Sequence, residues 1–212
     1  MTRIHIFCEG QTEETFVREV LQDHFQRFDI FVNPIIIRTS KTGKGGVSTY
    51  GKIKNQINRQ CLEDPTAWVT TMIDYYGLPS DFPGKINSPA GSSLLVAKYL
   101  QESFQQNIDR QNFIANLVVH EFEALLYSNP GAFKEWFNDE AKLKLAAERA
   151  LFESPEHIND HPITSPSKRI KKLCPKYDKV THGTLISLDI GLDLIRHECH
   201  LFDKWIKRLE GL

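Results

Sequence analysis

The chain has 212 residues, of which 41% are hydrophobic and 25% charged, and its formal net charge is −1 at pH 7. This composition is typical of a globular protein that needs neither disulfides nor a structural metal to build a core. The near-neutral balance excludes a generally basic nucleic-acid-binding protein but allows a local basic patch. We see no apolar run near the ~18 residues of a membrane helix and no signal-peptide pattern, so we expect a cytoplasmic protein with reduced cysteines and no membrane partner.

Short, β-prone apolar segments alternate with helical patterns in the first part of the chain. The expected strands are residues 3–8, 30–38, 68–74 and 113–119. The expected helices begin after Thr12 and cover 52–61, 92–106 and, later, 131–152. Since the strands are continuously hydrophobic, we expect both faces of the sheet to be covered. The alternation therefore predicts an α/β fold with a mostly parallel four-stranded sheet flanked by helices.

No strong strand pattern follows residue 128. Helical patterns there cover residues 167–173, 184–188 and 192–209. We find no repeat and no long linker, so we expect one domain over residues 1–212. Its α/β core would span 1–128, and a helical C-terminal extension would span 129–212.

Three of the expected strands end at acidic residues, which are Glu9, Asp74, and Glu121 with Glu123. Because parallel strands end at one edge of a sheet, where ligands bind, we expect these carboxylates to converge. Converging carboxylates repel each other, and a bound Mg²⁺ or Mn²⁺ would relieve that repulsion. Glu13, in the first helical turn after Glu9, is near enough to share the ion. We therefore predict Glu9, Glu13, Asp74 and Glu121 as metal ligands.

Two plainer explanations remain open for some of these residues. Glu13 and Glu14 are in the first turn of a helix, where acidic residues are common because they complement the helix dipole. Glu123 could be a solvated helix residue. His120 precedes Glu121 and could serve as a general base or orient a carboxylate, or it could be a buried structural histidine.

The same segments carry a family resemblance. Residues 8–16, CEGQTEETF, resemble the opening motif of Toprim-type proteins, in the EG-x-T-E version of the overcoming-lysogenization-defect nucleases. Residues 72–79, MIDYYGLP, and 120–126, HEFEALL, resemble later motifs of a bacterial family, domain of unknown function 4276. The pattern continues at residues 166–170 and 177–179. That family's fold is considered Toprim-like, so the resemblance implies a Toprim-like sheet.

Toprim sites hold Mg²⁺ with a glutamate after the first strand and an Asp-x-Asp after the third. Glu9 matches the glutamate and Asp74 the first aspartate, but Tyr76 replaces the second. Asp81 or Glu121 could substitute for the missing acid. If neither does, the site binds metal weakly or binds without catalysis.

Basic residues gather in two places. The loop around Lys41 and Lys44 is rich in Gly, Ser and Thr but lacks the context of an NTP-binding loop. A second run, in residues 165–172, contains Lys168 and Arg169. Both places could bind a nucleic-acid backbone through its phosphates, and both could instead be solvated surface, which is the interpretation favoured for the loop around Lys41 and Lys44.

Three functions compete on these grounds. The first is a Mg²⁺-dependent nuclease or phosphodiesterase with Glu9, Asp74, Glu121 and His120 as catalytic residues. The second, implied by the resemblance, is a non-catalytic Toprim-like subunit that works with a separate ATPase protein, in phage defence. The third is a protein that binds a nucleotide together with Mg²⁺.

Overall fold

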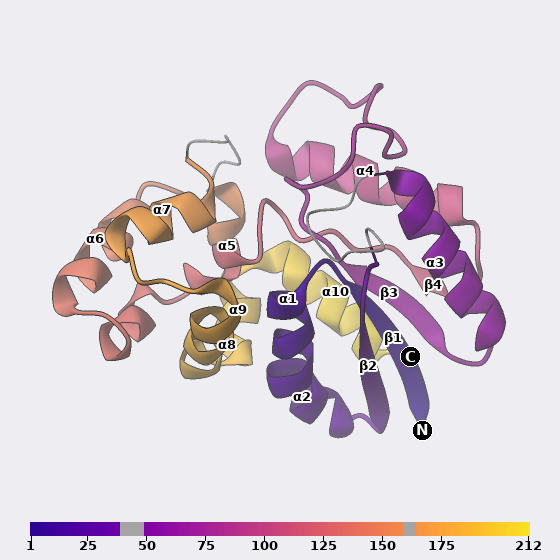
Figure 1. Ribbon diagram of the computed structural model, residues 1–212, viewed down its shortest axis with the longest axis horizontal. Helices are drawn as coiled ribbons and strands as arrows, with labels where there is room; N and C mark the ends of the chain where they lie inside the picture. The colour runs from indigo at the N-terminus through magenta and orange to yellow at the C-terminus, as the bar shows by residue number, and fades with distance from the viewer. Residues whose placement is uncertain (39–48, 159–163) are drawn as a thin grey trace.

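The structure, a computed structural model, describes residues 1–38, 49–158 and 164–212. Its sheet has four strands, β1 (Thr2–Cys8), β2 (Ile30–Ile36), β3 (Trp68–Met72) and β4 (Phe113–Ile114). Their order is β2-β1-β3-β4, and each neighbouring pair is parallel (Figure 1). The expected α/β class, with a parallel four-stranded sheet between helices, is confirmed.

Three strands end earlier than the sequence suggests, and the first of them, β2, stops at Ile36. β3 stops at Met72 and β4 at Ile114, and pairing resumes only at an isolated bridge between Asp74 and Val118. Asp74 therefore lies just beyond the regular sheet, at the carboxyl edge. β2 contains Pro34 and is an edge strand, as expected for a strand that lacks one ladder donor.

One face of the sheet is covered by α3 (Tyr50–Glu63) and α4 (Ser93–Ile108). Phe7 and Phe113 point to this face and pack in one buried cluster with Ile53 and Phe104. The ring centroids of Phe104 and Phe113 are 5.2 Å apart, in an edge-to-face arrangement. These contacts fix both helices above the strands, because a side chain from each helix fills the same layer as the strand residues.

The opposite face is covered by the first helical segment and by the last helix. The first segment contains α1 (Gln11–Phe16), a π-helical turn η1 (Val17–Leu21) and α2 (Gln22–Gln26). The last helix, α10 (His200–Glu210), lies behind the sheet in Figure 1. The indole N–H of Trp205 donates to the Thr70 hydroxyl at 3.0 Å, which ties α10 to β3.

The remaining helices lie beside the sheet, on the left in Figure 1. They are α5 (Glu123–Leu126), η2 (Pro130–Glu135), α6 (Asp139–Arg149), η3 (Pro155–His157), α7 (Pro166–Leu173), α8 (Lys179–Ile190) and α9 (Leu192–Glu198). The expected helix over residues 131–152 is wrong as one piece, because the Asn138 side chain accepts from the Ala141 N–H and starts a new helix. No helix in the described ranges is long and apolar enough to cross a bilayer.

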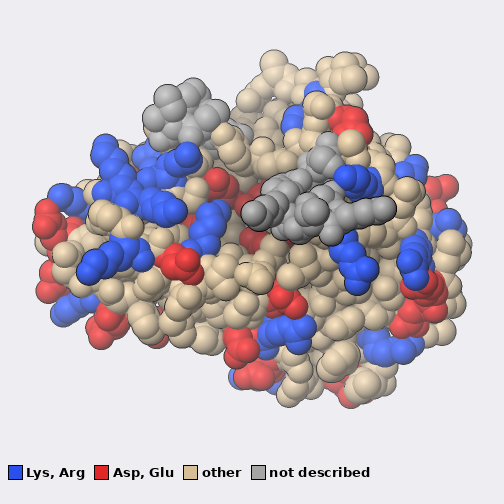
Figure 2. Space-filling model, in the orientation of Figure 1, with Lys and Arg blue, Asp and Glu red and all other residues tan. Residues whose placement is uncertain are grey.

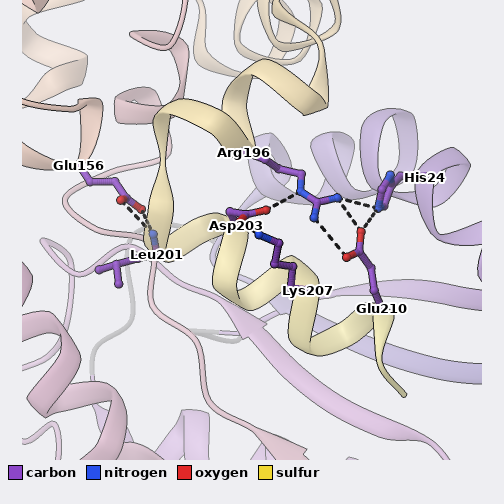
Figure 3. A network of polar contacts seen from close by, with 7 residues as sticks. All are labelled: His24, Glu156, Arg196, Leu201, Asp203, Lys207 and Glu210. Atoms are coloured by element: carbon purple, nitrogen blue, oxygen red, sulfur yellow. Dashed lines mark hydrogen bonds and ion pairs between the residues drawn. The ribbon is translucent and has the colours of Figure 1, made fainter.

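The expected continuous helix over residues 192–209 is also divided, at Cys199. The Glu156 carboxylate accepts from the Leu201 N–H at 3.0 Å and so caps the start of α10 (Figure 3). Arg196 of α9 then holds the two helices together, 2.7 Å from Asp203 and 2.6 Å from Glu210. His24 of α2 lies 2.6 Å from Glu210, so the network joins α2, α9 and α10.

Candidate functional site

The structure brings Glu9 and Asp74 together although 65 positions separate them. The Asp74 N–H donates to Glu9 Oε2 at 3.3 Å, and the Phe122 N–H donates to Asp74 Oδ1 at 2.9 Å. Gly77 lies close by, since a Cβ on it would be 3.1 Å from Glu9 Oε1. The segments after β1, β3 and β4 therefore meet at one point.

Glu13 and Glu121 lie at this point as well, and each carboxylate also binds backbone. Glu13 Oε2 accepts from the Gly10 N–H at 2.8 Å, which stabilises the start of α1. Glu121 Oε2 accepts from the Ser167 N–H at 2.9 Å, which attaches the start of α7 to the site. The capping role considered for Glu13 is thus present, together with its place beside Glu9.

Electrostatics confirm that these acids share one environment. Burial raises the pKa of Glu9 above its ordinary value, and the charges of Glu121 and Glu123 raise it further. Burial likewise raises the pKa of Asp74 well above its usual range, and Glu13 and Glu9 add to that shift. The neighbouring carboxylates therefore make ionisation of Glu9 and Asp74 harder, which is the situation that a bound cation relieves.

Lys179, which the sequence reasoning did not select, supplies a positive charge within this cluster. Its Nζ lies 3.0 Å from Oε1 and 3.1 Å from Oε2 of Glu123, whose side chain is 0% exposed. Burial alone would lower the pKa of Lys179, but the carboxylates of Glu123 and Asp74 outweigh it and raise that pKa. Glu123 is therefore a buried ion-pair partner and not a solvated helix residue.

A signal for Lys179 was present in the sequence. It falls in the segment 177–179 that continues the family pattern, directly after Asp178. The Asp178 side chain accepts from the Thr181 N–H at 2.9 Å and so caps α8. Lys179 is therefore the first residue of this helix.

Tyr177 is buried beside the same acids. Its hydroxyl has no hydrogen-bond partner within the described part of the chain. Burial raises the pKa of Tyr177 well above its ordinary value, and the charge of Glu123 adds to the effect. The hydroxyl fits because residue 183 of α8 is glycine, where a Cβ would lie 3.3 Å from it.

His120 is a buried residue in the wall of the site. It has a positive φ of 65°, a backbone conformation that few non-glycine residues adopt. Its Nε2 lies 2.9 Å from the carbonyl oxygen of Glu156, and because a carbonyl only accepts, Nε2 carries the proton. Its own carbonyl accepts from the Tyr76 N–H at 3.0 Å. His120 thus connects the Tyr76 loop to the Glu156 cap of α10.

The two candidate substitutes for the missing second aspartate lie in different places. Asp81 accepts from the Tyr50 N–H at 2.9 Å and caps the start of α3. Glu121 is the one whose charge raises the pKa of Glu9. Tyr76, which stands at the position of the missing acid, is 38% exposed.

The basic residues predicted to bind phosphate differ in where the structure places them. Lys41 and Lys44 lie outside the described residues. Lys168 is exposed on α7. Arg169 is engaged within the fold, since its Nε donates to the Thr164 carbonyl at 2.6 Å and its guanidinium lies 5.4 Å from the Phe152 ring centroid. Figure 2 shows lysines and arginines gathered over α6 and α7, to the left of an acidic hollow.

The donor set fits a hard divalent cation in its chemistry, because all its ligands would be carboxylate oxygens with unfavourable mutual charge. Side-chain positions do not yet form a closed site: across residues 1–38, 49–158 and 164–212, no three His, Cys, Asp or Glu side chains are grouped to hold a metal.

Comparison with known proteins gives a family and two similar structures. No curated protein matches the chain. The C-terminal region of the OLD protein of Xanthomonas campestris pv. campestris is similar with 15% identity and a TM-score of 0.45, covering 100% of this chain and 99% of that one. The C-terminal region of the Burkholderia pseudomallei OLD protein has 16% identity and a TM-score of 0.39, covering 99% of each chain. A family model described as Domain of unknown function (DUF4276) matches residues 8–210, so the chain belongs to the DUF4276 family.

Proposed function

We propose that this protein is a phosphodiesterase that depends on Mg²⁺ or Mn²⁺ and cleaves nucleic acid. The observation that carries the proposal is the group of carboxylates at the carboxyl edge of the sheet, where burial and neighbouring acids raise the pKa values of Glu9 and Asp74. The opening motif at residues 8–16 supports it, because its resemblance to overcoming-lysogenization-defect nucleases implies the same chemistry.

Each residue of the site has a defined part in this proposal. Glu9, Asp74, Glu13 and Glu121 would provide oxygen ligands for the metal. A bound divalent ion supplies an activated water and stabilises charge on the phosphoryl oxygens. Lys179, whose ammonium contacts Glu123, would limit the repulsion among the carboxylates, and its side chain is 48% exposed.

Nucleic acid has a basic surface available next to these acids. The Ser167 N–H in the first turn of α7 binds Glu121, and Lys168, Lys171 and Lys172 are exposed along this helix. Lysines along a helix neutralise successive phosphates in a sequence-independent way. A nucleic-acid backbone bound along α7 would therefore lead toward the carboxylates.

A cleavage assay tests this function. Single- and double-stranded DNA and RNA are incubated with the protein and Mg²⁺ or Mn²⁺, and with EDTA as the metal-free control. We expect Glu9→Gln and Asp74→Asn to lose cleavage by at least about a hundredfold, equivalent to about 2.7 kcal/mol of transition-state stabilisation. Glu140→Gln, an exposed acid on α6, is the matched control and should cleave normally. Wild-type rates in Glu9→Gln would refute the proposal.

A second function is favoured by one specific observation. Tyr76 stands where the second aspartate of an Asp-x-Asp would be, and no three side chains of the described residues are grouped as a metal site. These features suit a non-catalytic subunit that binds nucleic acid for a separate ATPase, in phage defence. DNA binding without cleavage, together with co-purification of an ATPase from the native host, would support this function. Calorimetry with nucleotides and Mg²⁺ would separate it from nucleotide binding.

A further inference from the structure

A pocket of about 230 Å³ lies between α4 and α10, at the β4 edge of the sheet and away from the acidic site. Its floor is apolar and consists of Ile114, Leu117 and Trp205, each no more than 4% exposed. The volume suits a small organic molecule, and the shape is concave, as ligand sites usually are.

The rim of this pocket is cationic. Lys98 comes from α4, and Lys204 and Arg208 come from α10, four positions apart on one helix face. All three are exposed, and none forms an ion pair with another residue in the described ranges. Among the residues that the structure describes, no acidic side chain lines the pocket. The rim thus presents uncompensated positive charge above an apolar floor.

A β-strand is a poor occupant, because the outer edge of this sheet is already occupied. The Ala115 N–H donates to Gln105 Oε1 at 2.8 Å, and the Leu117 N–H donates to Gln101 Oε1 at 3.1 Å. These α4 side chains take the place of a neighbouring strand, so strand addition would have to break both bonds.

We propose that this pocket binds a small amphipathic organic anion. Its aryl or alkyl group lies on Leu117 and Trp205, and its carboxylate, sulfonate or phosphate group binds Lys204 and Arg208. Apolar contact supplies most of the affinity, and the cations select for a negative charge. This inference does not rest on the proposed function, because none of these residues belongs to the acidic site.

The probe is 8-anilinonaphthalene-1-sulfonate, which joins an aromatic group to a sulfonate. We expect saturable binding of one molecule per chain, measured by its fluorescence. The double variant Lys204→Glu/Arg208→Glu should weaken binding at least about tenfold. The matched control Lys171→Glu/Lys172→Glu makes the same charge change on α7 and should alter the affinity by less than about twofold. Equal weakening by both double variants would overturn the proposal.

The position of the probe is read independently by NMR. The chain has three tryptophans, and only the indole N–H signal of Trp205 should shift on binding. Ala97→Phe, which fills the pocket from α4, should abolish that shift, while the thermal midpoint shows whether the variant folds. An unmoved Trp205 signal, or displacement of the probe by a single-stranded oligonucleotide, would refute a small-anion site.

Discussion

Replacing Lys179 by methionine removes a positive charge that contacts the buried Glu123 carboxylate. Both Glu123 oxygens lie 3.0–3.1 Å from Lys179 Nζ, and the Glu123 side chain is 0% exposed whereas that of Lys179 is 48% exposed. Removing one partner of a fully buried pair costs about 3–5 kcal/mol. Because water screens half of Lys179, we expect a loss of about 2 kcal/mol at neutral pH. For a chain of this size that lowers the thermal midpoint by roughly 6 °C.

The pH dependence of this loss has a definite sign. Burial raises the pKa of Glu123 above its ordinary value and Lys179 opposes that rise, so the variant has a still higher Glu123 pKa in the folded state. Above that pKa the folded variant must hold an uncompensated charge, and the full loss is present. As pH falls through the raised pKa values, Glu123 takes up a proton in both proteins and the loss disappears.

Thermal unfolding at about pH 8 and about pH 5 measures both effects. Lys176→Met is the matched control, because Lys176 is an exposed lysine three positions earlier and its replacement removes the same charge. We expect the difference between the two variants to be large at the higher pH and small at the lower one. Equal midpoints for both variants at the higher pH, or a difference that does not change with pH, would refute the ion-pair reasoning.

Three further substitutions have expected outcomes. Gly77→Ala places a Cβ 3.1 Å from Glu9 Oε1, so it should weaken Mn²⁺ binding in calorimetry while costing less than about 1 kcal/mol of stability; unchanged binding would contradict this. Arg196→Ala removes a guanidinium that is 15% exposed and bonded to two carboxylates, and urea unfolding should show a loss of about 3 kcal/mol. A loss below about 1 kcal/mol would mean that the network contributes little. Gly183→Ala gains about 1 kcal/mol of helix propensity but places a Cβ 3.3 Å from the Tyr177 hydroxyl. This overpacking should leave a net loss of about 1 kcal/mol in the same assay. A net gain would show that the Tyr177 side chain moves to make room for the methyl group.

The sheet and half of the site could be predicted from sequence because their signals are local. Continuous apolar segments indicate buried parallel strands, and an acid directly after such a segment must lie at the carboxyl edge. Glu9 and Asp74 are found there together. The ends of β3 and β4 were placed too late, because the residues after them remain extended and buried without regular pairing.

The rest of the site depends on long-range packing that no local pattern reveals. Lys179 reaches Glu123 only because α8 packs against α1 and α5. The division of the last helix at Cys199 depends on Glu156, which caps α10 from 45 positions away. The sequence predicts Arg169 as a phosphate ligand, but in the structure its guanidinium binds the Thr164 carbonyl and lies over the Phe152 ring.

The proposed function depends most directly on whether the carboxylates hold a metal ion. The decisive measurement is anomalous diffraction from crystals of the protein soaked with Mn²⁺, with Asp74→Asn crystals as the comparison. We expect a Mn²⁺ peak between the carboxylates of Glu9 and Asp74 in the wild type and its loss in the variant. Saturating Mn²⁺ with no peak at these residues, or a peak that persists in Asp74→Asn, would contradict the assignment of this site as a metal-dependent centre.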